Sequence, residues 1–171
     1  MQGKDVILGL LNSKEMTGYE IKEIFESQLK YFFDGTFGMI YPILKKLERE
    51  NLISNKRVFQ TSKPNKNVYS ITDKGRKEFQ TYLISVPSEE VYKSDFLMRL
   101  YFGQDLGNDE VVDFITLEIK RKKSCLNELQ ENYEKWKEAG MDSLQAITFE
   151  YGISYYEGTL KVLEKALSKL K

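Results

Sequence analysis

The sequence lacks histidine altogether and contains a single cysteine, Cys125. Without histidine, Ser–His and Cys–His nucleophiles are excluded, and zinc loses its commonest nitrogen ligand. One cysteine cannot form a disulfide within the chain, which suits a reducing compartment. The carboxylate pair Glu89–Glu90 could serve as acid and base, but no pocket-forming pattern surrounds it. We therefore expect no enzymatic activity, no bound metal and no cofactor.

Long apolar runs are also missing. The longest, such as residues 6–11, are far shorter than the roughly 20 residues of a membrane span. Asp5 is acidic where a secretory signal would be cationic, and no small-residue cleavage site follows it. The apolar fraction of 41% and charged fraction of 30% indicate a folded chain rather than a disordered one. We expect a cytoplasmic protein that has no membrane partner.

The 26 basic and 26 acidic residues are unevenly distributed along the chain. Residues 1–86 carry 14 Lys and Arg against 10 Asp and Glu, a net charge of +4, and residues 87–171 carry a net charge of −4. Within residues 36–80, 10 basic residues stand against 4 acidic ones. A basic segment in a neutral protein favours a polyanionic partner, although an ordinary solvated surface has the same composition.

The first third of the sequence predicts three short helices. Residues 6–11 form the apolar stripe of the first helix. Thr17 and Glu20 have the spacing of a capping box and open the second, whose apolar positions continue to Leu29. Asp34-Gly35-Thr36 breaks the chain, and Thr36 is a suitable cap for the third helix, which ends near residue 50. The residues expected to be buried by this third helix are Phe37, Ile40, Tyr41, Leu44 and Leu47.

Two β-prone runs follow, at residues 53–61 and 67–71, and turn-forming residues separate them. Thr72 then caps a helix that continues through Leu83. Three helices, a hairpin with a basic tip and a closing helix are the element order of a winged helix-turn-helix domain. We assign this DNA-binding domain to residues 1–86, so the fold class is mainly α with a small β-hairpin wing.

Residues 87–171 predict a helical dimerisation and effector domain. Residues 94–102 are apolar and aromatic, and Asn108 is a suitable cap for a long helix. A second long helix begins after Gly140, and two heptad helices joined by a short turn predict an antiparallel pair with one charged seam position, Lys122. The seam and dimerisation positions are Ile115, Ile119, Leu126, Leu129, Tyr133, Trp136, Ile153, Tyr156, Leu160, Leu163 and Leu167.

Each of the two long helices buries only one apolar stripe against the other, so their remaining apolar residues need another surface to pack against. The same helix pair from a second subunit would supply that surface and produce a symmetric homodimer. Packing against the first half of the same chain is the alternative. The residues concerned are Phe114, Leu117, Tyr151 and Tyr155.

The third helix and the wing hold the candidate contacts to double-stranded DNA. In this class of domain the third helix enters the major groove and the wing reaches neighbouring phosphates. If Ile40, Leu44 and Leu47 face the core, the helix start presents groove-facing residues and the later turns present cations to phosphates. The candidates are Thr36, Gly38, Met39, Tyr41, Pro42, Lys45, Lys46, Arg49, Lys56, Arg57, Lys63, Asn65 and Lys66.

Some of these residues have alternative roles. Thr36 is equally suited to be the helix cap. The wing cations could simply be solvated, and the ring of Tyr41 could pack at the core boundary. Pro42 is tolerated near the first turn, where backbone amides lack partners. No arginine in the first turns can bridge a guanine, so specificity is expected from several weak contacts, from water or from DNA shape.

Aromatic residues in the second half are candidates for an effector site. Aromatic side chains with polar tips line sites for planar ligands, and we select Phe96, Tyr101 and Tyr155, with core packing as the alternative. Lys122 could pair with an acidic effector. Alternatively its stem packs while its ammonium reaches solvent, or it fixes the helix register.

Several motifs in combination resemble the PadR-like family of transcriptional regulators. The resemblance covers about the first 83 residues closely and the remainder only in plan. It implies a homodimeric repressor of palindromic operators, released by an effector or by cell-envelope stress, with Tyr41 and the basic residues of the third helix and wing on the DNA. The motifs are Ile7-Leu8-Gly9-Leu10-Leu11, Thr17-Gly18-Tyr19-Glu20-Ile21, Tyr41-Pro42-x-Leu44-x-x-Leu47-Glu48, Leu52-Ile53 and Tyr69-x-Ile71-Thr72-x-x-Gly75.

Two other classes of protein share parts of this pattern. A MarR-type regulator normally has a dimerising helix before the DNA-binding domain, and only about five residues precede the first helix here. A winged-helix adaptor that binds proteins would not need lysines on both the third helix and the wing.

Overall fold

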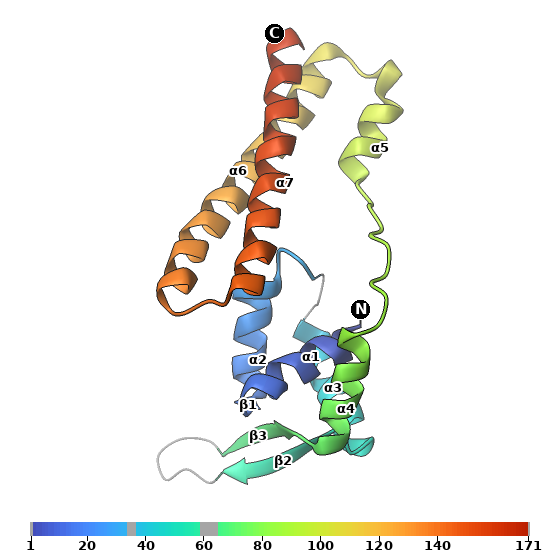
Figure 1. Ribbon diagram of the computed structural model, residues 1–171. Helices are drawn as coiled ribbons and strands as arrows, with labels where there is room; N and C mark the ends of the chain where they lie inside the picture. The colour runs from blue at the N-terminus through green and yellow to red at the C-terminus, as the bar shows by residue number, and fades with distance from the viewer. Residues whose placement is uncertain (1, 34–36, 59–64, 171) are drawn as a thin grey trace. The chain divides into compact units, whose positions relative to one another are not determined.

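The computed structural model describes residues 2–33, 37–58 and 65–170, with only the backbone of Phe37. The chain forms two compact units, Met1–Glu90 and Val91–Lys171 (Figure 1). Each unit has its own hydrophobic cluster. Among the described residues, no helix has both the length and the apolar character needed to cross a membrane.

The described residues of the first unit form four α-helices: α1 (Gly3–Ser13), α2 (Gly18–Ile24), α3 (Phe37–Arg49) and α4 (Asp73–Leu83). They confirm the predicted order of three short helices and a closing helix. The second helix also continues into one turn of π-helix, Phe25–Leu29, which the apolar spacing did not indicate. The helices meet in a core that includes Ile7, Ile40 and Leu47.

A three-stranded antiparallel sheet completes this unit. The strands β2 (Ile53–Val58) and β3 (Lys66–Ile71) form the predicted hairpin, with Asn55 opposite Tyr69. The described part of the first predicted run, β2, spans Ile53–Val58, and residues 59–61 of that run lie outside the described residues. A further strand, β1 (Met16–Thr17), pairs with the other edge of β3, so the order is β1-β3-β2. A strand of two residues has no alternation to recognise, so the sequence pattern missed it.

The junction between β1 and α2 is closed by the predicted capping box. The Glu20 amide donates to Thr17 Oγ1 at 3.2 Å, and the Thr17 amide donates to Glu20 Oε2 at 2.7 Å. Hydrogen bonds from the Thr17 backbone and hydroxyl lower the pKa of the Glu20 carboxyl. The box therefore fixes where α2 begins relative to the sheet.

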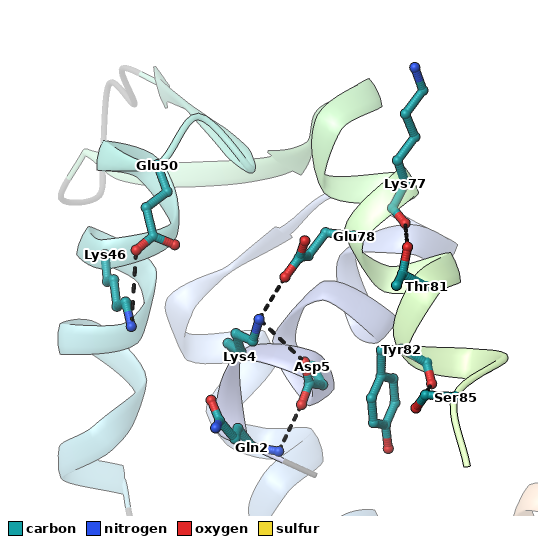
Figure 2. Close-up of polar contacts among 10 residues, drawn as sticks. All are labelled: Gln2, Lys4, Asp5, Lys46, Glu50, Lys77, Glu78, Thr81, Tyr82 and Ser85. Carbon is teal, nitrogen blue, oxygen red and sulfur yellow. Dashed lines mark hydrogen bonds and ion pairs between the residues drawn. The ribbon is translucent and has the colours of Figure 1, made fainter. Parts of the chain in front are cut away.

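The ends of α3 and α4 are also held by specific contacts. Asn51 adopts a φ of 57°, and the Leu52 amide donates to the Leu47 carbonyl at 2.9 Å, which turns the chain from α3 into β2. Lys4 Nζ donates to Glu78 Oε1 at 2.7 Å and so links α1 to α4 (Figure 2). This bond raises the pKa of the Lys4 ammonium and lowers that of the Glu78 carboxyl.

The second unit contains α5 (Asp95–Tyr101), a short 3-10 turn (Gly103–Asp105) and the two long helices α6 (Asn108–Glu138) and α7 (Ser143–Leu170). The long helices lie side by side (Figure 1). Their polar contacts join the start of one to the end of the other, because Asn108 bonds to Leu170 and Tyr133 bonds to Glu150. This confirms the predicted antiparallel pair.

The cap of α6 differs from prediction, and the structure also identifies the cap of α7. Asn108 does not cap α6; its Nδ2 donates to the Leu170 carbonyl at 3.1 Å, and Gly107 occupies the cap position. Asp142 caps α7, because its Oδ1 accepts from the amides of Leu144 at 2.8 Å and Gln145 at 3.0 Å. The turn before it contains Gly140 with a φ of +91°, a conformation that favours glycine.

The capping box gives a testable expectation for stability. Thr17→Ala removes the acceptor for the Glu20 amide and should lower the free energy of unfolding in urea by about 1 kcal/mol. Thr81→Ala is the matched control, because the Thr81 hydroxyl only donates to the Lys77 carbonyl of its own helix (Figure 2). This control should change stability by less than about 0.5 kcal/mol. Equal losses in the two variants would contradict the capping role.

Candidate nucleic-acid interface and cavity

Helix α3 has one buried and one exposed face. Ile40, Leu44 and Leu47 are 1% exposed or less and anchor the helix in the core, as predicted. Because this face is fixed, the opposite side chains point away from the protein. The candidates on the exposed side are Gly38, Met39, Pro42, Lys45, Lys46 and Arg49.

Tyr41 departs from the expectation that α3 buries it. Its side chain is 45% exposed. The ring packs closely over the start of α2, where a Cβ atom on Gly18 would lie 2.9 Å from Tyr41 Cε1. One edge of the ring therefore contacts protein while the residue remains accessible at the surface. This agrees with the alternative that its ring packs at the core boundary.

Pro42 lies in the second turn of α3, just past the first turn near which we expected a proline to be tolerated. It is the sixth residue of α3, so its missing N–H leaves the Gly38 carbonyl without its usual helical partner. The helix nevertheless continues to Arg49. The exposed start of α3 thus combines a glycine and a proline, and residues 37–44 carry no formal charge.

The wing strands place further cations near α3. Lys56 is opposite Val68 and Arg57 is opposite Asn67, and as neighbours along β2 they point to opposite faces of the hairpin. Lys66 lies at the start of β3, close enough to Glu20 to contribute to the low pKa of that carboxyl. Asn65 is also exposed. Two further candidates, Thr36 and Lys63, lie outside the described residues.

The cations exposed on α3 and Lys56 of β2 are only weakly engaged among the described residues. Lys46 Nζ lies 4.0 Å from Glu50 Oε1, an exposed pair one helical turn apart (Figure 2). Such pairs contribute little and are readily exchanged for another anion. Within the part of the chain that the structure describes, Lys45, Arg49 and Lys56 form no ion pair. These four side chains can therefore bind phosphate without first breaking strong internal bonds.

A cavity of about 400 Å³ lies within the second unit. It is lined by two of the three effector candidates, Phe96 and Tyr155. Tyr101, the third, does not line it: the residue is 79% exposed and its ring packs edge-on against Phe102. Tyr92 does line it, and the sequence offered no signal for this because the residue lies outside the helical periodicity. The complete lining is Tyr92, Ser94, Phe96, Leu97, Glu118, Lys122, Ser154, Tyr155, Gly158, Thr159, Val162 and Leu163.

The charged and phenolic groups of this cavity lie close together. Lys122 Nζ lies 3.5 Å from Glu118 Oε1 and 5.0 Å from the centroid of the Tyr155 ring. The hydroxyl oxygens of Tyr92 and Tyr155 are 3.0 Å apart, and this hydrogen bond is the main cause of a raised pKa at Tyr92. The side chain of Lys122 is 13% exposed, so the cavity presents a partly buried ammonium with its neighbouring carboxylate and two phenols, beside hydroxyl and apolar side chains.

The residues expected at the dimer contact lie in the seam between α6 and α7 of one chain. Ile115, Ile119, Leu129, Leu160 and Leu163 are buried there, and the other members of the set are partly buried. Contacts with a second subunit would therefore need other side chains. The exposed apolar residues of the two helices are Leu117, Leu144, Ile147, Tyr151, Tyr155 and Val162.

Three short helices, the third with an outward-facing cationic side, and a β-hairpin define a winged-helix transcriptional regulator. The model of the transcriptional regulator PadR-like family matches residues 7–81, and a virulence activator alpha C-terminal model matches residues 92–171. The chain is 34% identical over 169 residues to the negative transcriptional regulator PadR of Bacillus subtilis, covering 98% of this chain and 89% of that protein. The chain belongs to the PadR-like family of transcriptional regulators.

Solved structures agree with this assignment. The smu.1604c protein of Streptococcus mutans has a TM-score of 0.91 and 50% identity over 98% of this chain and 99% of its own. Bacillus subtilis PadR in complex with operator DNA has a TM-score of 0.86 and 30% identity, with 98% of both chains covered. The same protein in complex with p-coumaric acid has a TM-score of 0.78 and 31% identity, over 98% and 97% of the two chains.

The exposure of the cationic surface predicts that it contributes little to stability. Lys45→Gln, Arg49→Gln and Lys56→Gln should each leave the free energy of unfolding within about 0.5 kcal/mol of the original value. Leu44→Ala, on the opposite face of α3, should cost about 2–5 kcal/mol because it creates a cavity in the core. Chemical denaturation measures both. Large losses in the polar variants would mean that these side chains hold the fold together.

Proposed function

We propose that the protein is a homodimeric repressor that binds a palindromic operator in the cytoplasm and is released by a small aromatic acid. The first unit is the DNA-binding domain and the second is the dimerisation and effector domain. The observation that carries the proposal is the exposed cationic face of α3 beside the basic wing, fixed by the burial of Ile40, Leu44 and Leu47.

In this proposal α3 enters the major groove with its N-terminal turns nearest the bases. Gly38, Met39 and Pro42 are small or apolar and allow a close approach, which suits contacts to thymine methyl groups and to shape more than bidentate hydrogen bonds. Lys45, Lys46 and Arg49 follow along the groove and bind phosphates. The other proposed phosphate contacts are Thr36, Tyr41, Lys56, Arg57, Lys63, Asn65 and Lys66.

Dimerisation is proposed through the outer surface of the α6–α7 pair. Leu144, Ile147 and Tyr151 are 75%, 60% and 64% exposed and recur at helical spacing on α7. An isologous contact through such a stripe would remove it from water and relate two DNA-binding domains by a two-fold axis. Two domains about 34–36 Å apart reach successive major grooves, which accounts for a palindromic target. The solved complex of Bacillus subtilis PadR with operator DNA supports the DNA target of this proposal.

The cavity of the second unit is the proposed effector site. A planar carboxylic acid would place its carboxylate by the Lys122 ammonium and its ring between Phe96 and the tyrosines. Aromatic and charge-assisted contacts are the usual means of recognising such ligands. The complex of Bacillus subtilis PadR with p-coumaric acid supports this ligand class.

Release of DNA requires that the effector favours one arrangement of the protein over another. Tyr92 follows directly after the boundary between the units and contributes to the cavity wall. A ligand that separates the Tyr92 and Tyr155 hydroxyls would free the segment that connects the units. The DNA-binding domains of a dimer would then lose their fixed spacing.

DNA binding is tested with a duplex selected from a random-sequence library by the unaltered protein. Lys45, Lys46, Lys56 and Lys66 are replaced together by glutamine, and the salt dependence of the affinity is measured by fluorescence anisotropy. The slope of log affinity against log salt should fall by about one for each phosphate that the variant no longer neutralises.

A control with the same change in charge separates specific contacts from net charge. Lys120, Lys161, Lys165 and Lys169 belong to α6 and α7, outside the proposed interface, and their glutamine variant should retain the original slope. Equal losses in the two variants would contradict the proposed interface. Failure of the unaltered protein to select any duplex would instead favour an adaptor that binds proteins.

The effector site is tested by titrating p-coumaric acid into the protein by calorimetry and into its complex with the selected duplex. Phe96→Ala and Lys122→Met should each weaken binding about tenfold or more, because the first removes an aromatic ring and the second removes a charged hydrogen bond. Tyr101→Ala is the matched aromatic control and should bind as the original does. Binding that survives at full strength in both cavity variants would place the site elsewhere.

A further inference from the structure

Gly18 occupies a position where the backbone itself does not demand glycine. Among the described residues, Gly140 is the glycine with a positive φ, so Gly18 lies in a region open to any amino acid. It is the first residue of α2, and alanine is a better helix former than glycine. The constraint on this position therefore comes from its surroundings.

The nearest of those surroundings is the Tyr41 ring. A Cβ atom at Gly18 would lie 2.9 Å from Tyr41 Cε1 and 3.2 Å from both Cζ and Oη. A separation below about 3 Å is shorter than van der Waals contact between carbon atoms allows. Gly18 is buried, whereas Tyr41 is 45% exposed. One of the two residues would have to move, and they differ in their freedom to do so.

Gly18 is held in place from two directions. Thr17, the residue before it, pairs with Val68 of β3 and closes the capping box with Glu20. The start of α2 is thereby tied to the wing strand and to its own first turn. Tyr41 has solvent on one side, so an added methyl group would push its ring outward and leave the backbone of α2 in place.

We propose that Gly18 is a positioning residue for DNA recognition, because its missing side chain makes the space in which Tyr41 lies and so sets the direction of the tyrosine hydroxyl. This inference rests on the proposed function, in which Tyr41 contacts a phosphate. It also gives a role to the two-residue strand β1. By pairing with β3, this strand fixes the start of α2 relative to β3 and therefore relative to the wing. In this proposal Gly18 is the position at which α2, the wing and Tyr41 are placed relative to one another.

The test is a double-mutant cycle with Gly18→Ala and Tyr41→Ala, read as affinity for the selected duplex and as the thermal unfolding midpoint. Gly18→Ala alone should fold and should lose about tenfold in affinity, the size expected for a hydrogen bond to a charged phosphate. In the Tyr41→Ala background there is room for the methyl group, so Gly18→Ala should change affinity by less than about twofold.

Gly9→Ala provides the matched control. It adds a methyl group 3.0 Å from the Phe79 ring in the same unit, and the three atoms nearest to that methyl group all belong to Phe79, so it should retain duplex affinity at temperatures below its unfolding midpoint. An unchanged affinity in Gly18→Ala, or equal losses with and without Tyr41, would overturn the inference. Failure of the unaltered protein to bind any duplex is a separate result, which would overturn the proposed function.

Discussion

The packing of one face of α3 against the core is the constraint on which the recognition surface depends. Ile40, Leu44 and Leu47 are almost fully buried, and their spacing leaves the helix a single orientation. Rotating the helix by one residue would expose these side chains and bury lysines, at a cost of several kcal/mol for the apolar area alone. The direction of Lys45 and Arg49 therefore follows from apolar packing and not from any attraction between cations and the rest of the protein.

The second unit is organised by a comparable seam, with one interruption that has chemical consequences. Leucines and isoleucines close α6 against α7, while Lys122 places a charge among them. A partly buried ammonium needs partners, and Glu118 and the Tyr155 ring provide them. The Lys122–Glu118 pair borders the cavity, so a carboxylate ligand would compete for an ammonium that already has an anionic neighbour. The same residue thus links helix packing to ligand chemistry.

Much of this fold could be predicted from the sequence because its helices follow short-range rules of capping and apolar spacing. The Thr17–Glu20 capping box, the apolar spacing of α3 and the heptads of α6 and α7 each follow from local periodicity or pairing. The exposed cations of α3 and the wing could then be predicted as well. The exposed side of a helix or strand is known once its buried side is known.

The features that escaped prediction depend on contacts between distant parts of the chain. The strand β1 exists because Met16 and Thr17 meet the free edge of β3. Asn108 bonds to Leu170 instead of capping its own helix, and Tyr92 reaches the cavity through its bond to Tyr155. Tyr101 resembled Phe96 in sequence, yet α5 turns it toward solvent. Neither composition nor periodicity specifies such pairings, because each joins segments that the sequence alone does not place together.

The central claim is that α3 and the wing form the surface that meets DNA. Amide hydrogen exchange of the protein, measured with and without the selected duplex, tests it most directly because it requires no substitution. Bound duplex should slow exchange in residues 37–49 and in the strands β2 and β3, while α6 and α7 retain their original rates. Slowed exchange confined to the long helices, with α3 and the hairpin unchanged, would contradict the account.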